Sequence, residues 1–436
     1  MSEYDSTFGT TQPSRRDFLK TSTVAVVGGA LAGSLALGRS AHAAGGSDTL
    51  KIGLIGCGGR GSGAVLNALA ADPDIKLTAL ADVFEDKLKL GLRNLKDAAP
   101  PEKIAVQPEN CFAGFDAYQK LLATDVDVVL LATPPHFRPL HLKAAVAAGK
   151  HVFCEKPVAV DAPGVRSVLA TCEEAKKKSL SVVSGLCWRY DAPTREYIKR
   201  IHEGAIGDVV ALQANYLTTP LLYTPRQSEW SDMEYQLRNW NYFTWLSGDF
   251  NVEQHVHSLD KAAWVMHDVP PVRASGIGGR QVRGEEQGQV FDHFAVTYEY
   301  ANGVRLYSFC RQMAGCPSDV SDHVVGTKGM AEWGIGPHPF ITGPNAWKDH
   351  GPKTNKYEVE HQELFGSIRS SSPINNGLYM CRSTMMAIMG RMACYTGQAL
   401  TWDQCLASKE DLTPPRYELG PMPMPPVAKP GLTPFV

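Results

Sequence analysis

Two short stretches of the sequence carry side chains that could move a proton at a reacting alcohol. VFCEKPVAV (152–160) places Glu155 and Lys156 directly after an apolar run, and EQHVHSLD (253–260) supplies Glu253 and His257. An imidazole with an ordinary pKa of about 6.5 can accept a hydroxyl proton. Lys156 could stabilise the alkoxide or relay the proton, because burial and a neighbouring cation favour its neutral form. Glu253 could orient His257 or bind substrate, so we predict these three residues to be catalytic.

Simpler roles are open for the same residues. Lys156 could be a surface lysine paired with Glu155, and His257 could be a core histidine. Glu253, His255 and His257 could ligate a metal on an extended segment, where alternate side chains share a face. On a helix the three side chains would spread over different faces, and we expect no metal.

A glycine-rich segment, GCGGRG (56–61), lies between an apolar run at 50–55 and a helical pattern. In a dinucleotide site Gly56 makes the tight turn, Gly58 lets the backbone approach a pyrophosphate, and Gly61 lets helix pack on strand. Gly59 and Arg60 complete the loop, and Arg60 could approach a phosphate. A plain glycine-rich turn is the alternative.

An acidic residue stands at the distance that this kind of site requires. Asp82 follows Gly61 by 21 residues and ends the second apolar run. Its carboxylate is placed to accept from ribose hydroxyls, which favours NAD over NADP. Thr133, Pro134 and His136 end the apolar run at 126–132 and could press on a nicotinamide, although a plain turn is also possible.

The pattern along the chain predicts an α/β fold. Apolar strands alternate with helices from 50 to 185, which predicts a doubly wound parallel Rossmann sheet. Residues 186–412 show strand alternation with a hairpin signal at 301–303, which predicts a mostly antiparallel sheet, and residues 364–400 are helical again. A segment containing Trp230, Trp240 and Trp245 could line a sugar cleft, or pack as core or lid. The Pro-rich tail at 413–436 is predicted to be extended.

Composition narrows the partners. The chain has 436 residues and a net charge of -2, which gives no general attraction to nucleic acid or anionic membrane. We therefore expect a small molecule or a neutral polymer. The ten cysteines form no CxxC pair and are expected to be buried, although Cys310 and Cys316 could pair in an oxidising compartment.

Residues 1–43 contain the three parts of an export signal in their usual order. SRRDFLK (14–20) is a twin-arginine motif, an apolar Gly/Ala-rich run follows at 24–37, and Ala41 and Ala43 form an A-x-A cleavage site. We predict export by the twin-arginine route to the periplasm or another extracytoplasmic space. A buried helix with a basic first turn and an uncleaved anchor are the alternatives.

Five of these stretches together resemble the Gfo/Idh/MocA family (glucose–fructose oxidoreductase, inositol dehydrogenase and rhizopine catabolism): GCGGRG, Asp82, ATPPH, AAGKHVFCEKP and EQHVHSLD. The resemblance spans residues 50 to 400. It implies a Rossmann domain followed by an α/β domain whose large open sheet serves oligomerisation. It also implies NAD(P)-dependent chemistry on a sugar or polyol substrate, with Lys156 near substrate and nicotinamide and Glu155 near the cofactor. Arg189 falls where an arginine follows the next strand, and we include it among the cofactor-binding residues.

The chain departs from that pattern at three positions. Arg138 stands where related exported members often have histidine, Glu253 replaces the usual Asp, and His255 adds an imidazole. The leading hypothesis is an exported NAD-dependent oxidoreductase with a tightly bound, internally recycled cofactor. The alternatives are an NAD-retaining glycosidase that oxidises C3 transiently, and a noncatalytic sugar-binding protein.

Overall fold

A parallel sheet forms the first half of the computed structural model, which describes residues 49–334, 338–351 and 354–436. Its strand order is β3-β2-β1-β4-β5-β6 and all neighbours pair in parallel, which confirms the predicted doubly wound parallel sheet. The strands are β1 (Leu50–Ile55), β2 (Ile75–Asp82), β3 (Cys111–Ala113), β4 (Val128–Leu131), β5 (His151–Cys154) and β6 (Val182–Ser184). β1 and β4 are buried almost throughout, because helices cover both faces of the sheet. The predicted export signal lies outside the described residues.

Five helices connect and cover these strands. They are α1 (Gly59–Ala71), α2 (Glu85–Ala98), α3 (Ala117–Leu122), α4 (Arg138–Ala147) and α5 (Ala162–Lys177). The strand order reverses between β1 and β4, and ligands bind at the carboxyl edge at such a point. The sheet therefore fixes where the glycine-rich turn and the EKP segment can meet a ligand.

A second sheet of nine strands follows, in the order β14-β13-β12-β11-β7-β10-β9-β8-β15. Its strands are β7 (Val209–Thr218), β8 (Arg273–Gly279), β9 (His293–Glu299), β10 (Arg305–Gln312), β11 (Asp319–Gly326), β12 (Met330–Gly334), β13 (Phe340–Thr342), β14 (Trp347–Lys348) and β15 (Leu400–Thr401). Only β10 and β7 pair in parallel, so the prediction of a mostly antiparallel sheet is confirmed.

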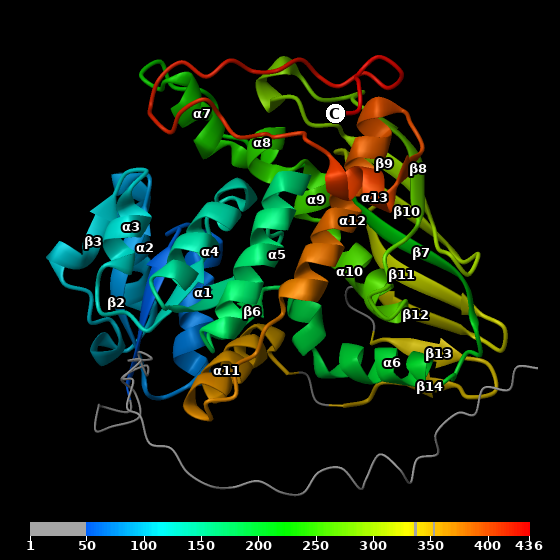
Figure 1. Ribbon diagram of the computed structural model, residues 1–436, viewed down its shortest axis with the longest axis horizontal. Helices are drawn as coiled ribbons and strands as arrows, with labels where there is room; N and C mark the ends of the chain where they lie inside the picture. Colours follow the sequence, from blue (N-terminus) through cyan, green and yellow to red (C-terminus); the bar gives the residue numbers. More distant parts are fainter. Residues whose placement is uncertain (1–48, 335–337, 352–353) are drawn as a thin grey trace, which may run out of the picture. The chain divides into compact units, whose positions relative to one another are not determined.

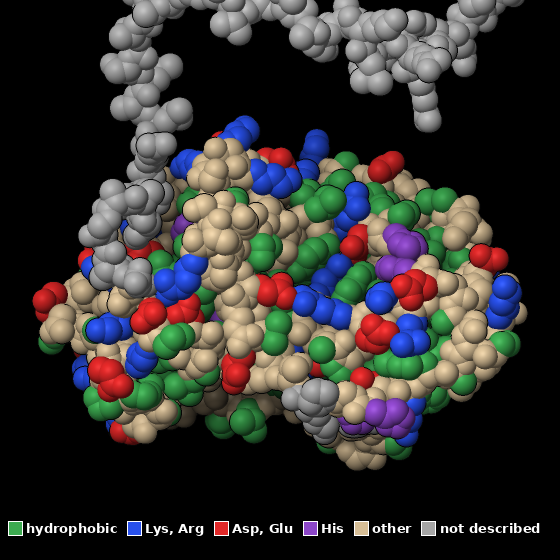
Figure 2. All heavy atoms as spheres, turned by 90° about the horizontal axis from the view of Figure 1, so that it is seen from below, with side chains coloured by type: hydrophobic (Ala, Val, Ile, Leu, Met, Phe, Trp, Pro, Cys, Tyr) green, Lys and Arg blue, Asp and Glu red, His purple; other side chains and the backbone are tan. Residues whose placement is uncertain are grey.

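Helices pack on one face of this second sheet and link it to the first (Figure 1). They include α6 (Ala192–His202), α10 (Val256–Val265) and α12 (Gly377–Thr396), whereas α11 (Lys356–Arg369) packs on the first sheet. α12 is buried along nearly its whole length and packs on both α5 and β8, whereas α11 packs on α1. Acidic and basic side chains are interspersed on the face seen in Figure 2, and an Arg195–Glu363 ion pair of 2.7 Å joins α6 to α11.

The last segment is extended, as its composition predicted, and lies against the chain's own surface. Backbone hydrogen bonds join it to α7 (Asp232–Arg238), where the amide of Met233 donates to the carbonyl of Gly420 over 3.1 Å. All ten cysteines are free thiols. Over the described residues, no helix combines the length and apolar character needed to cross a membrane.

Candidate functional site

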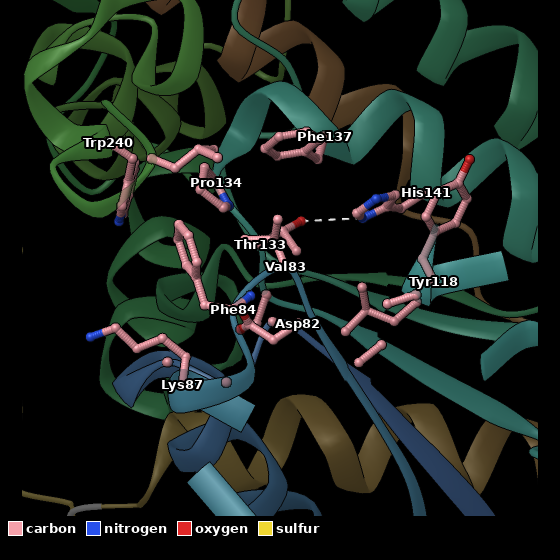
Figure 3. A pocket seen from close by; sticks show the side chains of 18 of the residues that line it. Asp82, Val83, Phe84, Lys87, Tyr118, Thr133, Pro134, Phe137, His141 and Trp240 are labelled. Atoms are coloured by element: carbon pink, nitrogen blue, oxygen red, sulfur yellow. Dashed lines mark hydrogen bonds between the residues drawn. The ribbon is translucent and has the colours of Figure 1, made fainter. Parts of the chain in front are cut away.

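A pocket of about 330 Å³ opens at the carboxyl edge of the parallel sheet. Its walls include the glycine-rich turn, Asp82 at the end of β2, and Thr133 and Pro134 after β4 (Figure 3). Arg238 and Trp240, from α7 and the following 3-10 helix η6 (Trp240–Tyr242), close its outer side. The pocket lies at the point where the strand order reverses, so the fold and the cavity indicate the same binding site.

The glycine-rich turn has the shape of a pyrophosphate cradle. Gly56 has φ of +103°, and a Cβ there would lie 2.7 Å from the backbone of Ala132. A Cβ at Gly61 would lie 1.9 Å from the carbonyl oxygen of Gly56, whereas Gly58 and Gly59 face open space. α1 begins at Gly59, so its free backbone N–H groups point towards that space. The turn thus fits the pyrophosphate of a dinucleotide.

Asp82 is fixed by the backbone on either side of it. The amide of Cys57 donates to Oδ2 over 2.7 Å, and that of Phe84 donates to Oδ1 over 3.0 Å. Burial raises the pKa of Asp82, while these two hydrogen bonds act in the opposite direction. Because its orientation is set, the carboxylate can accept from a ribose in the pocket, and the residues present fit NAD.

Arg60 lines the pocket and also reaches two carboxyl groups beside it. Its guanidinium donates to Glu155 and, over 3.1 Å, to Glu360 from α11. Glu360 is fully buried, and burial together with Glu155 raises its pKa well above the usual range, against the effect of Arg60. Local sequence patterns do not reveal the role of Glu360, because it lies 300 residues from Arg60 in an ordinary amphipathic helix.

Lys156 and Glu253 are brought together. The ammonium group donates to the carbonyl oxygen of Glu253 over 2.6 Å and to its Oε1 over 3.0 Å. Glu253 can be reached because it ends the short helix α9 (Phe250–Glu253). An ammonium has three donors, so Lys156 keeps one N–H for a further acceptor. The lysine is therefore held by Glu253 rather than by its neighbour Glu155.

His257 lies one turn further on, in the first turn of α10, and is partly buried. Burial, followed by the charges of Lys156 and Lys261, lowers its pKa well below 6.5, so the ring is neutral at neutral pH. Its Nδ1 is buried with no hydrogen-bond partner in the part of the chain that the structure describes. A neutral imidazole of this kind can accept a proton.

His255 belongs to the second sheet rather than to this site. Its Nε2 lies 2.7 Å from Oγ of Ser308 on β10, and burial lowers its pKa to about 3. The helix break between Glu253 and Val256 separates the side chains that an extended segment would have aligned. Among the residues that the structure describes, no three His, Cys, Asp or Glu side chains are grouped to hold a metal ion.

Two residues predicted to bind cofactor lie away from the pocket. Arg189 donates to Asp260 over 2.8 Å and to Asp268 over 2.5 Å, and its guanidinium stacks on the ring of Tyr379. His136 is buried, its Nε2 lies 2.8 Å from the hydroxyl of Tyr417, and burial lowers its pKa to about 4. Both partners are distant in sequence, so the local motif could not reveal these structural roles.

Thr133 and Pro134, by contrast, line the pocket as predicted. The hydroxyl of Thr133 lies 3.3 Å from Nδ1 of His141, the contact drawn in Figure 3. Trp240 lines the same pocket and Trp245 is buried beneath it, so this part of the Trp-rich segment forms a lid rather than a sugar cleft.

The lid is attached to the Rossmann domain by Arg238. Its guanidinium reaches Asp86 of α2 over 3.0 and 3.1 Å and lies 4.1 Å above the ring of Phe84. Behind the lid, Tyr417 of the tail packs against Phe115 and Phe137, two rings that line the pocket. The lid and the tail together enclose the place where the cofactor fits.

Comparison with known proteins identifies the family. A model of the oxidoreductase family with an NAD-binding Rossmann fold matches residues 50–184, and the Gfo/Idh/MocA C-terminal domain model matches residues 194–332. The chain belongs to the Gfo/Idh/MocA family. The EKP lysine and the site that it shares with His257 therefore stand in a fold built to bind NAD.

Individual Gfo/Idh/MocA relatives are distant. A glycosyl hydrolase family 109 protein of Solibacter usitatus is 30% identical over 246 residues, which cover 53% of this chain and 52% of that protein. Inositol 2-dehydrogenase of Rhizobium meliloti is 30% identical over 161 residues, covering 37% and 43%. The chain thus spans about half the length of these relatives, or less. Aldose-aldose oxidoreductase of Caulobacter crescentus shares the fold, with a TM-score of 0.64, 19% identity and coverage of 81% of this chain and 99% of that one.

Proposed function

We propose that this protein is an NAD-dependent oxidoreductase that acts on a secondary hydroxyl of a sugar, glycoside or polyol. The observation that carries the proposal is the placement of Lys156, whose ammonium group is held by Glu253 at the carboxyl end of β5. His257 follows in the next helix with a neutral ring. NAD, when bound, supplies the hydride acceptor.

His257, Lys156 and Glu253 have separate roles in the proposed reaction. His257 accepts the hydroxyl proton, and the free N–H of Lys156 donates to the developing alkoxide oxygen. The substrate carbon that bears this hydroxyl would lose its hydrogen as a hydride to bound NAD, so that the CH–OH group becomes a carbonyl. Glu253 is a positioning residue in this scheme, because it fixes the direction of Lys156.

We further propose that the cofactor stays bound between turnovers. The lid that Arg238 fastens to Asp86 and the tail behind it support this, since both oppose release. Our proposal of twin-arginine export leads to the same expectation, because free NAD is scarce outside the cytoplasm. A retained cofactor must be recycled in the site, by oxidising one substrate and reducing another.

A retained cofactor also serves a second candidate, a glycosidase that oxidises C3, eliminates the aglycone, adds water and reduces the ring again. The relative named as a glycosyl hydrolase family 109 protein, 30% identical, favours it. The same Lys156 and His257 would serve the oxidation and the final reduction.

The open face of the second sheet supports a homo-oligomer, which we also propose. Tyr307 and Phe309 on β10 are exposed and alternate with buried neighbours, and Ile277 and Val325 are exposed on strands of the same sheet. Exposed apolar groups spread over several strands of one sheet favour association. Light scattering after size exclusion tests this, and a monomer would contradict it.

The nucleotide released from the protein is the first test. Denaturing the purified protein should release NAD or NADH, identified by mass and absorbance. Aryl glycosides are then offered without added cofactor: aryl release identifies the glycosidase, whereas a change in cofactor absorbance with sugars or polyols identifies the oxidoreductase. Protein that neither contains nor binds NAD(H) would exclude both.

A further inference from the structure

Arg138 is a buried cation without a counter-ion in the part of the chain that the structure describes. It begins α4, and only 1% of it is exposed. One Nη donates to the carbonyl oxygen of Leu131 over 2.9 Å and lies 3.5 Å from the hydroxyl of Thr133, while Nε has no partner among the described residues. Buried charges are normally paired, so this guanidinium is exceptional.

The nearby carboxylates are already used. Burial lowers the pKa of Arg138, and Glu155 and Glu253 oppose this from a distance. Glu155 pairs with Arg60, and Glu253 pairs with Lys156. These two ion pairs cancel. Burial and Glu155 raise the pKa of Glu360, the second partner of Arg60, well above the usual range and so favour its neutral form. A guanidinium stays protonated even when buried. The charge of Arg138 is therefore left over at this edge of the sheet.

The excess charge is buried at the carboxyl end of β4, next to the edge of the sheet where a dinucleotide would bind. Leu131 ends β4, and its carbonyl also accepts from the amide of Glu155, which follows β5. Asp82, on the β2 side, takes the adenosine ribose, and the glycine-rich turn takes the pyrophosphate. The nicotinamide half would then extend over the ends of β4 and β5, where Arg138 is anchored to Leu131 and Lys156 follows β5.

We propose that Arg138 sets the redox poise of the bound cofactor by favouring its reduced form. This inference rests on the proposed function. The nicotinamide ring is positively charged when oxidised and neutral when reduced, so a fixed cation nearby weakens binding of the oxidised form alone. Arg138 thereby shifts the equilibrium between bound alcohol and bound ketone towards the ketone.

The identity of the residue matters for this effect. His141, one turn further along α4, is buried and its pKa is lowered to about 3. A histidine at position 138 would meet the same burial, which favours the neutral ring at neutral pH. Arginine is the side chain that keeps a permanent charge there.

Binding measured separately for the two forms of the cofactor tests the proposal. Nucleotide-free protein is titrated with NAD+ and with NADH by calorimetry, and the ratio of the two Kd values is compared between variants. Arg138→Met should reduce the preference for NADH on the order of tenfold, mainly by tightening NAD+. Lys143→Met, which removes an exposed cation from the same helix, should keep the wild-type ratio.

The outcomes are distinct. An unchanged ratio in folded Arg138→Met, or wild-type protein that binds NAD+ more tightly than NADH, overturns the role of Arg138 and leaves the proposed function intact. Wild-type protein that binds neither nucleotide removes the proposed function itself. If Arg138→Met does not fold, Arg138→His carries the same expectation as a neutral variant.

Discussion

Individual residues at this site are held mainly by partners far away in sequence. Lys156 reaches Glu253, Arg60 reaches Glu360, and His136 reaches Tyr417, which lies 281 residues away. The glycines and Asp82 could be predicted because strand, turn and helix are contiguous in the chain. Arg189 and His136 were assigned wrongly to the cofactor, because no local pattern shows that Asp268 or Tyr417 will engage them.

Lys156 carries the first prediction. Lys156→Met removes the donor to the alkoxide and leaves Glu253 without its cation, so turnover should fall by about 10²–10⁴-fold while NAD stays bound. Single-turnover change in cofactor absorbance measures this. Lys150→Met is the matched control, since Lys150 precedes the opposite end of β5 and donates to the carbonyl of Thr124. Wild-type turnover in Lys156→Met and in His257→Ala would indicate the noncatalytic sugar-binding protein instead.

Asp82 carries the second prediction. Asp82→Ser removes the charged acceptor for the ribose hydroxyls but keeps a small polar side chain. NAD should bind more weakly, and the preference for NAD over NADP should shrink by about tenfold or more, since charge-assisted hydrogen bonds contribute about 1.5–3 kcal/mol. Fluorescence titration with both reduced cofactors gives the ratio, and an unchanged ratio would refute the assignment.

Elements decide which residues can act together. β1, β2, β4 and β5 of the parallel sheet were predicted because each is apolar and bounded by turns, whereas β3 has only three residues and gave no such pattern. The hairpin between β9 and β10 follows its Asn-Gly signal. The break that ends α9 at Glu253 and starts α10 at Val256 was not predictable, because it depends on packing against distant elements. That break turns His255 to the second sheet and leaves His257 near Lys156.

The contact of the lid with α2 provides a prediction at the scale of secondary-structure elements. Arg238→Ala removes the contacts between α7 and both Asp86 and Phe84, so the pocket should open more often and NADH should dissociate faster, by about threefold to tenfold. Stopped-flow fluorescence with excess NAD measures the rate. Arg226→Ala is the control, because Arg226 pairs with Asp232 inside the lid segment. Equal dissociation rates in wild type, Arg238→Ala and Arg226→Ala would rule out a role of Arg238 in keeping the lid closed.

The whole molecule buries several neutral histidines, and its stability should depend on pH accordingly. His361 lies between the rings of Phe153 and Phe365, and neither ring nitrogen has a hydrogen-bond partner among the described residues. Burial lowers its pKa from 6.5 to about 3. Between these values the unfolded chain binds a proton that the folded chain refuses, so the free energy of unfolding falls as pH is lowered.

His361→Phe isolates this effect from the carboxylates, which titrate in both proteins. Above pH 6.5 the difference in unfolding free energy between variant and wild type should be constant. Below it, the difference should grow in favour of the variant by about 1.4 kcal/mol per pH unit. Urea unfolding at several pH values gives the slopes, and parallel curves would show that His361 is not the group responsible.

The bridge from Arg60 to Glu155 and Glu360 also limits the order in which these positions can change during evolution. Losing Arg60 first would leave two carboxylates facing each other in a buried space. Replacing Glu360 by glutamine first leaves one balanced pair, after which the arginine can be exchanged together with Glu155. Lineages that lack Arg60 should therefore have passed through a neutral residue at position 360. Positions 60, 155 and 360 should also covary, although all three lie far apart in the sequence.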